Sequence, residues 1–249
     1  MSVVKEHCTA FGIHPIPATI AKEDFEAKCE ALVESFLELP VAQRNFLRFD
    51  ILTQNDQIAD LVTSLGLPEP QPVVCLRCEY ETDANWAECL RDPDFVKAME
   101  AGRSWGFHES ACIFSADVVT KLESDATRDR NVVVAILRVP AHMSPAEFRG
   151  KIDALLDGIH ELRKPSAIRS TMYVQNLNAE EHLQAAGFPP AQPALVLVGE
   201  CKSWHELFQT YDDAEVMNRL GAAMKEFAFD VEPICISADV VVKFRRPRA

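Results

Sequence analysis

Two stretches decide the fold: Ser115-Ala-Asp-Val-Val-Thr-Lys121 and Ser237-Ala-Asp-Val-Val-Val-Lys243, which agree at six of seven positions, 122 residues apart. Further matches precede them in the same order at offsets of 121 to 123 residues: Gln71-Pro72 with Gln192-Pro193, Gln54-Asn55 with Gln175-Asn176, Arg48 with Arg169, and the run Phe25 to Leu32 with Phe148 to Leu155. Ordered matches at a nearly constant offset indicate an internal repeat. We therefore predict one unit present twice, in residues 1–126 and 127–249.

Each unit shows strand and helix patterns in the order β-α-β-β-α-β. In the second unit, Val132 to Val139 is a β-branched run typical of a strand, and Ser144-Pro145-Ala-Glu147 has the residues that open a helix. The other segments that we expect in the second unit are strands at 168–174, 194–198 and 234–244 and a helical stretch at 203–227. Those of the first unit are strands at 46–52, 73–76 and 111–122 and a helix at 86–99, with a polar linker at 123–130.

A βαββαβ unit forms a four-stranded antiparallel sheet with both helices on one face, the ferredoxin-like arrangement. The other face must be covered by another element. Two units in one chain predict an α+β protein in which two ferredoxin-like repeats pack sheet to sheet as a pseudo-dimeric α/β barrel.

Composition excludes several classes of partner. The formal net charge of −13 argues against nucleic acid, which needs a basic footprint, and against anionic membrane surfaces. No apolar run approaches the roughly 18 to 20 residues of a membrane span, and the first residues do not resemble a signal peptide. Most of the eight cysteines lie in apolar runs, which favours reduced thiols and a cytoplasmic location. Cys75-Leu-Arg-Cys78 has no second pair, so we expect no metal site.

Three features carry a family resemblance: the helix opening Arg138-Val-Pro-Ala-His-Met-Ser144-Pro-Ala-Glu-Phe148, the acidic second helices Trp86…Asp92-Pro-Asp94-Phe95 and Trp204…Asp212-Asp213, and Ala228-Phe229-Asp230 before the last strand. With them the chain resembles the dimeric α/β-barrel superfamily, and within it the EthD-like and antibiotic-biosynthesis-monooxygenase-like families. EthD-like proteins often carry a histidine in the first helix. The matching positions here are Val33 and Leu156, so that family's acid–base group is not carried over.

The resemblance implies a small-molecule cavity between the two sheets. We expect a cofactor-independent enzyme of secondary metabolism, a cyclase, decarboxylase, isomerase or related lyase, whose partner is a hydrophobic, oxygenated molecule of aromatic or polyketide-like type. One alternative is a non-catalytic small-molecule-binding or stress-type barrel. Another is a haem-handling or monooxygenase barrel, which would need a histidine as axial ligand. The outer strand edges would leave room for a homodimer.

Strand alternation selects the residues that face the inter-sheet space. Arg48 and Asp50 share the polar face of one strand, and Arg169 and Tyr173 share that of its repeat. Arg48, Asp50 and Arg169 are candidates for binding a carboxylate or enolate, and Tyr173 for orienting a substrate oxygen. The alternative is a structural pairing of the arginines with Glu79 or Glu200, because a buried charge needs a partner.

Histidine is the natural acid–base group near neutral pH. We select His14, at the end of the first strand, and His7, which alternates with Thr9 and Phe11. Arg138, roughly opposite His14, and His108, just before a strand, are further candidates for substrate binding. His142, His160, His182 and His205 fit solvated positions. The repeated pairs Asp117/Lys121 and Asp239/Lys243 fit structural ion pairs or a guarded sheet edge.

Overall fold

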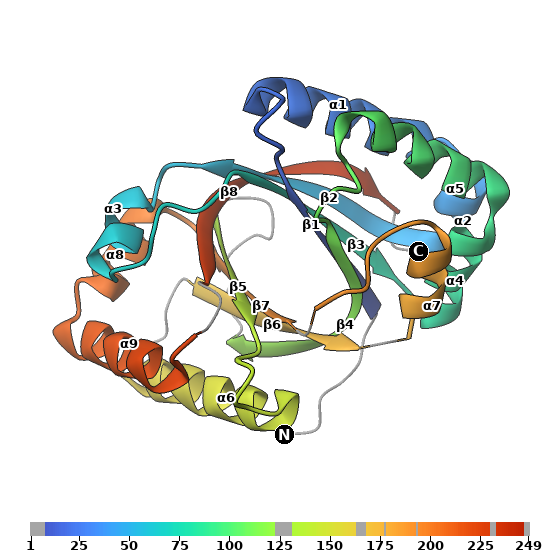
Figure 1. The fold of residues 1–249 in the computed structure, drawn as a ribbon. Helices are drawn as coiled ribbons and strands as arrows, with labels where there is room; N and C mark the ends of the chain where they lie inside the picture. The colour runs from blue at the N-terminus through green and yellow to red at the C-terminus, as the bar shows by residue number, and fades with distance from the viewer. Residues whose placement is uncertain are drawn as a thin grey trace.

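Eight antiparallel strands form one closed barrel in the order β1-β3-β2-β8-β5-β7-β6-β4 (Figure 1). The computed structural model describes residues 8–122, 131–162, 168–176, 178–192, 194–229 and 233–246. Below, residues 8–122 are the first half and residues 131–246 the second half. The strands are β1 (Cys8–Pro15), β2 (Phe46–Asn55), β3 (Val73–Tyr80), β4 (Cys112–Leu122), β5 (Asn131–Arg138), β6 (Ile168–Asn176), β7 (Ala194–Cys201) and β8 (Ile234–Arg245).

The two halves meet edge to edge, through β2 with β8 and β4 with β6. Within the first half the strands pair in the order β4-β1-β3-β2, and within the second half in the order β8-β5-β7-β6. Because the barrel is closed, every strand has a neighbour on both sides. The sheet edges that we expected to be open to a second copy are therefore used inside the chain. A homodimer would need another surface.

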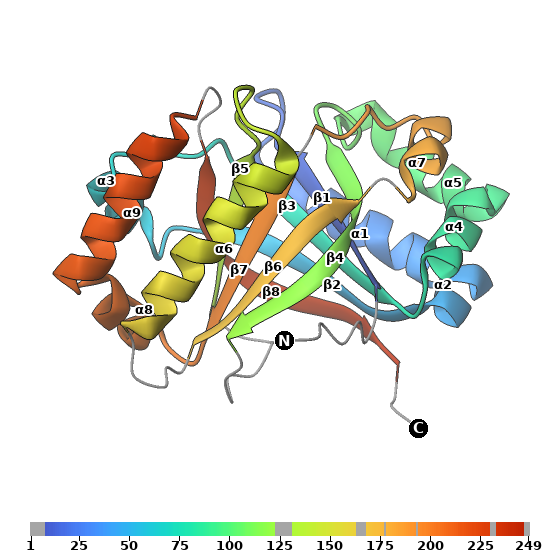
Figure 2. The ribbon, with the colours of Figure 1, turned by 90° about the horizontal axis from the view of Figure 1, so that it is seen from below.

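The helices cover the outside of the barrel in two groups on opposite sides (Figures 1 and 2). One group is α1 (Lys22–Leu37), α2 (Pro40–Asn45), α4 (Asp83–Arg91), α5 (Pro93–Glu100) and the 3₁₀-helix η1 (Ala101–Trp105). The other is α6 (Pro145–Glu161), α8 (Trp204–Tyr211) and α9 (Ala214–Phe227). The short helices α3 (Ala59–Ser64) and α7 (Glu180–Ala185) cross over. Each belongs to one half and lies beside the helices of the other half, α3 near α8 and α7 near α4.

The helix starts follow the local sequence. Ser144 and Ser203 accept backbone hydrogen bonds at the first turns of α6 and α8, as their capping sequences predict. The single helices that we expected at 86–99 and 203–227 are each split in two. Asp92 caps α5 just before Pro93, which cannot continue a helix, and Asp213 caps α9.

Ion pairs between the halves repeat in the two-fold pattern of the sequence. Lys121 on β4 contacts Asp153 and Asp157 of α6, at 3.0 and 2.9 Å. Lys243 on β8 contacts α1, through Glu30 and, at 2.7 Å, Glu34. Lys243 follows Lys121 by 122 residues, and the two aspartates follow the two glutamates by 123. These lysines thus form structural ion pairs that connect strand to helix across the two halves, whereas the sequence pattern had paired each lysine with the aspartate of its own strand, Asp117 or Asp239.

Two of the expectations fall outside the described residues: His7, and the linker 123–130 that contains the boundary between residues 1–126 and 127–249. Asp230 is also outside them. Among the described helices, none is both long and apolar enough to cross a lipid bilayer.

Candidate functional site

A cluster of buried charges occupies the barrel interior. Arg48 donates through Nε to both carboxylate oxygens of Asp50, at 2.7 and 2.8 Å. Arg77 donates through Nη2 and Nε to the same carboxylate, at 2.7 and 2.9 Å. All three side chains are buried. Asp50 is therefore held between two guanidinium groups of its own half.

The second half contributes the carboxylate of Glu200 and the phenol of Tyr173 to this cluster. Arg77 Nη1 lies 3.3 Å from Glu200 and 3.4 Å from the hydroxyl of Tyr173, and Arg169 Nε lies 3.7 Å from Glu200. Burial raises the pKa of Tyr173, which keeps the phenol neutral. Buried charges are tolerated when they are paired and hydrogen-bonded. The cluster thus joins the two halves through the centre of the barrel.

Strand alternation correctly placed Arg48, Asp50, Arg169 and Tyr173 on the inner face. They contact other protein side chains, which fits the structural pairing; their binding of a substrate stays a prediction. The sequence reasoning missed Arg77. The signal was present in β3, where Val73, Cys75, Arg77 and Glu79 alternate on the inner face.

Apolar side chains also occupy the barrel interior. All eight strands contribute to one buried cluster, which includes Phe11, Leu52, Val73, Phe114, Val132, Tyr173, Val196 and Ile236. Phe11 packs against Tyr173, with ring centroids 5.5 Å apart. Buried side chains from all eight strands thus meet between the two sheets, and a substrate cavity at this place stays a prediction.

His14 points out of the barrel. Thr9, Phe11 and Ile13 are the inward residues of β1, so His14 has the opposite parity and lies between the sheet and the helices. It is fully buried, and its ring stacks on Phe107 with centroids 4.0 Å apart. The placement of His14 at the mouth of an inter-sheet cavity is thus corrected. Arg138, at the end of β5, is close enough to Cys112 for its charge to act on that thiol.

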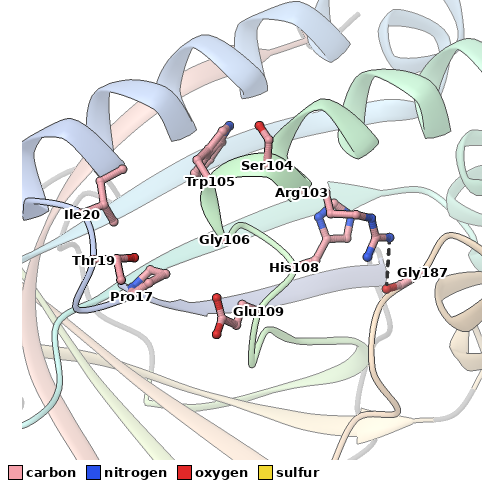
Figure 3. A pocket seen from close by; sticks show the side chains of 10 residues that line it. All are labelled: Pro17, Thr19, Ile20, Arg103, Ser104, Trp105, Gly106, His108, Glu109 and Gly187. Atoms are coloured by element: carbon pink, nitrogen blue, oxygen red, sulfur yellow. Dashed lines mark hydrogen bonds between the residues drawn. The ribbon is translucent and has the colours of Figure 1, made fainter.

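His108 lines an open pocket of about 520 Å³ between the loop after β1, the segment from η1 to β4, and Gly187 of the second half (Figure 3). Its ring is nearly buried and stacks on Phe188, with centroids 4.3 Å apart. Burial, with the charge of Arg103, lowers the pKa of His108. Arg103 reaches from η1 to the carbonyl oxygen of Gly187, at 3.5 Å. His14 and His108 thus lie in one region, outside the barrel and away from Arg48, Asp50, Arg169 and Tyr173.

An apolar cavity of about 170 Å³ lies between the sheet and the helices of the second half. We call it the second-half cavity. Its walls come from β5, β6, β7, α6, α8 and α9, and Leu61, Leu65 and Leu67 of the first half close it from the side of α3. Among its lining residues, those with polar side chains are His160, Ser170, Thr171 and Tyr211. Burial raises the pKa of Cys235 to about 12, so this lining thiol is neutral.

The first half has a smaller cavity, of about 40 Å³, at the equivalent place. We call it the first-half cavity. The strand registers define the equivalence: Phe49 pairs with Cys78 across β2 and β3 as Ser170 pairs with Gly199 across β6 and β7. At the offsets of 121 to 123 residues that relate the two halves, nine lining residues of the first-half cavity have equivalents that line the second-half cavity. They are Ala10, Gly12, His14, Phe36, Phe49, Leu76, Cys78, Phe107 and Ile113.

Side-chain volume explains the difference between the two cavities. Where the first half has Phe49 and Cys78, the second half has Ser170 and Gly199. Phe49 packs edge-on against Phe36 at a centroid distance of 5.4 Å and fills the layer. A Cβ placed on Gly199 would meet no atom within 4 Å, so this strand position borders open space. The larger cavity of the second half thus results from its smaller side chains at these two positions.

Comparisons with known proteins agree with this architecture. Neither a protein-family model nor a curated protein sequence matches the chain. Among solved structures, an anthrone oxidase-like protein matches with a TM-score of 0.64 at 13% identity, over 97% of this chain and 94% of its own. A proposed monooxygenase of Fusobacterium nucleatum subsp. nucleatum matches with a TM-score of 0.57 at 8% identity, over 98% of this chain and 100% of its own.

A proposed monooxygenase of Lactobacillus acidophilus matches with a TM-score of 0.51 at 7% identity, over 95% of this chain and 96% of its own. At these identities the likeness concerns the fold. The protein has the fold of the dimeric α/β barrels, with the whole barrel formed by one chain.

Proposed function

We propose that the protein binds a compact, mainly apolar, oxygen-bearing molecule in the second-half cavity and acts on it as a small-molecule enzyme. The observation that supports this proposal is the cavity itself. Apolar lining with a few polar groups is the usual composition of a ligand site. The equivalent cavity of the first half has only about 40 Å³, so the larger volume is a property of these residues and not of the fold.

The volume sets the size of the ligand. An apolar cavity of about 150 Å³ stays dry and binds a molecule such as benzene. The second-half cavity, at about 170 Å³, therefore suits a single ring with one or two substituents. Sites for larger ligands occupy roughly 300–1,000 Å³. Of the aromatic or polyketide-like molecules that the sequence suggested, one with several fused rings would need the helices to move apart.

The polar lining suggests how such a molecule would be oriented. Ser170 and Tyr211 offer hydroxyl groups to one substrate oxygen, and His160 on α6 offers the imidazole of an acid–base group. His160 takes the role that the sequence assigned to His14. The sequence could have indicated this place for His160, because the residue follows Leu155, Leu156 and Ile159 on α6, and these also line the cavity.

The finer proposal is cofactor-independent conversion of a phenolic or related aromatic compound. Proteins of the same fold described as anthrone oxidase-like or as monooxygenases support an aromatic or oxygen-bearing substrate. Proton transfer, as in a cyclase, decarboxylase, isomerase or lyase, remains the other reaction class within the proposal. The matching offsets of the two cavities also support the proposal that the halves are diverged ferredoxin-like repeats.

The haem alternative does not fit the cavity. A haem-handling barrel needs a histidine as axial ligand, and His160 is the histidine that lines the second-half cavity. A cavity sized for one ring does not admit a tetrapyrrole macrocycle, so we derive no step through haem. A non-catalytic carrier would use the same cavity and is distinguished by the absence of turnover.

Titration of the protein with single-ring phenols tests the proposal. Ser170→Phe introduces the side chain that the first half has at the equivalent position, Phe49, and should fill the cavity. Gly150→Ala, at an exposed position of α6, is the matched control. We expect binding to weaken at least tenfold in Ser170→Phe and to stay unchanged in Gly150→Ala. Equal binding by Ser170→Phe would refute the site. His160→Phe that binds the phenol but does not convert it would support an enzyme over a carrier.

A further inference from the structure

The first-half cavity is small, and half of its lining residues have aromatic rings. It lies between β1, β2, β3 and β4 and the helices α1, α4 and α5, and its walls include Phe36, Phe49, Phe95, Met99 and Phe107. Two lining side chains, His14 and Trp86, carry ring nitrogens. In an apolar surrounding such groups need hydrogen-bond partners.

The tautomer of His14 follows from its hydrogen bond to the backbone of Phe107. Nδ1 lies 2.9 Å from the carbonyl oxygen of Phe107. A carbonyl oxygen only accepts, so Nδ1 carries the hydrogen and Nε2 of the neutral ring has a free lone pair. Burial lowers the pKa of His14 to about 4, which keeps the ring neutral.

Nε2 of His14 lies beside Gly12, and both residues line the first-half cavity. Nε2 is buried and has no hydrogen-bond partner among the residues that the structure describes. It lies 3.0 Å from the position that a Cβ on Gly12 would take. Gly12 lines the first-half cavity, so the absence of its side chain leaves space beside Nε2.

Trp86 has the complementary group. Its Nε1 is buried and, within the described part of the chain, also lacks a hydrogen-bond partner. An indole N–H can only donate, whereas Nε2 of this His14 tautomer can only accept. A buried polar group without a partner costs about 1–3 kcal/mol. A molecule that donates one hydrogen bond and accepts another would satisfy both groups.

Volume limits the ligand to a very small one. A cavity needs roughly 10–15 Å³ of probe-occupied volume to hold a water molecule. The first-half cavity has about 40 Å³, enough for one water and too small for a ring compound. We propose that the first-half cavity is a second binding site, for a water-sized molecule that donates a hydrogen bond to His14 Nε2 and accepts one from Trp86 Nε1.

The two cavities then differ in chemistry as well as size. Leu137 occupies the position equivalent to His14, 123 residues later, so the second-half cavity lacks this acceptor. The same layer of the fold would thus hold a hydroxylic molecule in one half and an apolar ring in the other. Phe49 and Cys78 keep the first site small.

A crystal structure of the full chain at a resolution that shows ordered water tests the proposal. We expect one oxygen peak within hydrogen-bond distance of both His14 Nε2 and Trp86 Nε1. The peak should be lost in His14→Phe and kept in His205→Phe, a change of an exposed histidine. An empty cavity in the wild type would overturn the proposal, and so would a peak that stays in place in His14→Phe.

A measurement on the wild type alone guards against a variant that does not fold. Nitrogen-15 NMR of the histidine rings should show His14 protonated at Nδ1, with the Nε2 resonance shifted toward that of a hydrogen-bonded acceptor. The indole proton of Trp86 should show magnetisation transfer from a bound water. A ring protonated at Nε2, or an unshifted acceptor together with no transfer to Trp86, would overturn the proposal.

Discussion

Ser170 and Gly199 face each other across β6 and β7, at the place where Phe49 and Cys78 face each other across β2 and β3. The side chains at this pair of positions are smaller in the second half than in the first. Both pairs lie on the outer face of the sheet, under helices. The first pair borders a cavity of about 170 Å³ and the second a cavity of about 40 Å³.

Two strand glycines that face these cavities should respond in opposite ways to alanine. Gly199→Ala should stabilise the protein by about 0.5–1 kcal/mol, because its Cβ meets no atom within 4 Å and alanine restricts the unfolded chain. Gly12→Ala should destabilise it, because its Cβ would lie 3.0 Å from His14 Nε2. Urea unfolding midpoints of the two variants measure this. A loss of stability in Gly199→Ala would contradict an open cavity there.

The charge cluster in the barrel should show strong coupling. Arg77→Val or Asp50→Thr alone should cost about 3–5 kcal/mol, because each breaks a buried ion pair and leaves the other charge buried with one partner fewer. The second half has Val198 and Thr171 at the equivalent positions. The double variant should therefore cost clearly less than the sum of the two single changes. A double-mutant cycle from denaturant unfolding checks this, and additive costs would argue against a direct pairing.

The free energy of unfolding should decrease as the pH is lowered, because of His14. Its folded pKa, about 4, is depressed below the usual 6.5, so the unfolded chain binds a proton first as the pH falls. The stabilisation is complete above pH 6.5 and decreases between 6.5 and 4, by about 3 kcal/mol in total. The free energy of unfolding, measured from pH 7.5 to 5, should decrease less in His14→Gln than in the wild type. His205→Gln should keep the wild-type slope.

The lysines that connect the halves should contribute equally and independently. Lys121→Met and Lys243→Met should each cost about 1 kcal/mol or less, because the carboxylates that they contact are partly or largely exposed. The two costs should add in the double variant, since the pairs share no partner. Both should shrink at high salt. Unequal costs, or costs independent of salt, would contradict the symmetric pairing.

The fold could be predicted largely from the sequence, because strand and helix signals are local. The β-branched run of β5 and the cap at Ser144 each lie within a few residues. Alternation within β2 also placed Arg48 and Asp50 in the barrel. His14 was misplaced by its position at the strand end, although its parity, opposite to Thr9 and Phe11, indicated the outer face.

The candidate site could not be predicted in the same way. The second-half cavity depends on the joint volumes of residues far apart in the chain, such as Ser170, Gly199 and Leu61. A serine or a glycine in a strand does not by itself indicate a hollow. Only the register of β6 with β7, compared with that of β2 with β3, shows which side chains are missing.

Crystals soaked with 4-bromophenol would test the central claim most directly. The bromine gives an anomalous signal that locates a single-ring ligand without prior assumptions about its site. The account predicts one strong peak in the second-half cavity, between Ser170, Gly199 and His160. A peak in the barrel interior beside Arg77 and Tyr173, or no bound ligand at all, would contradict it.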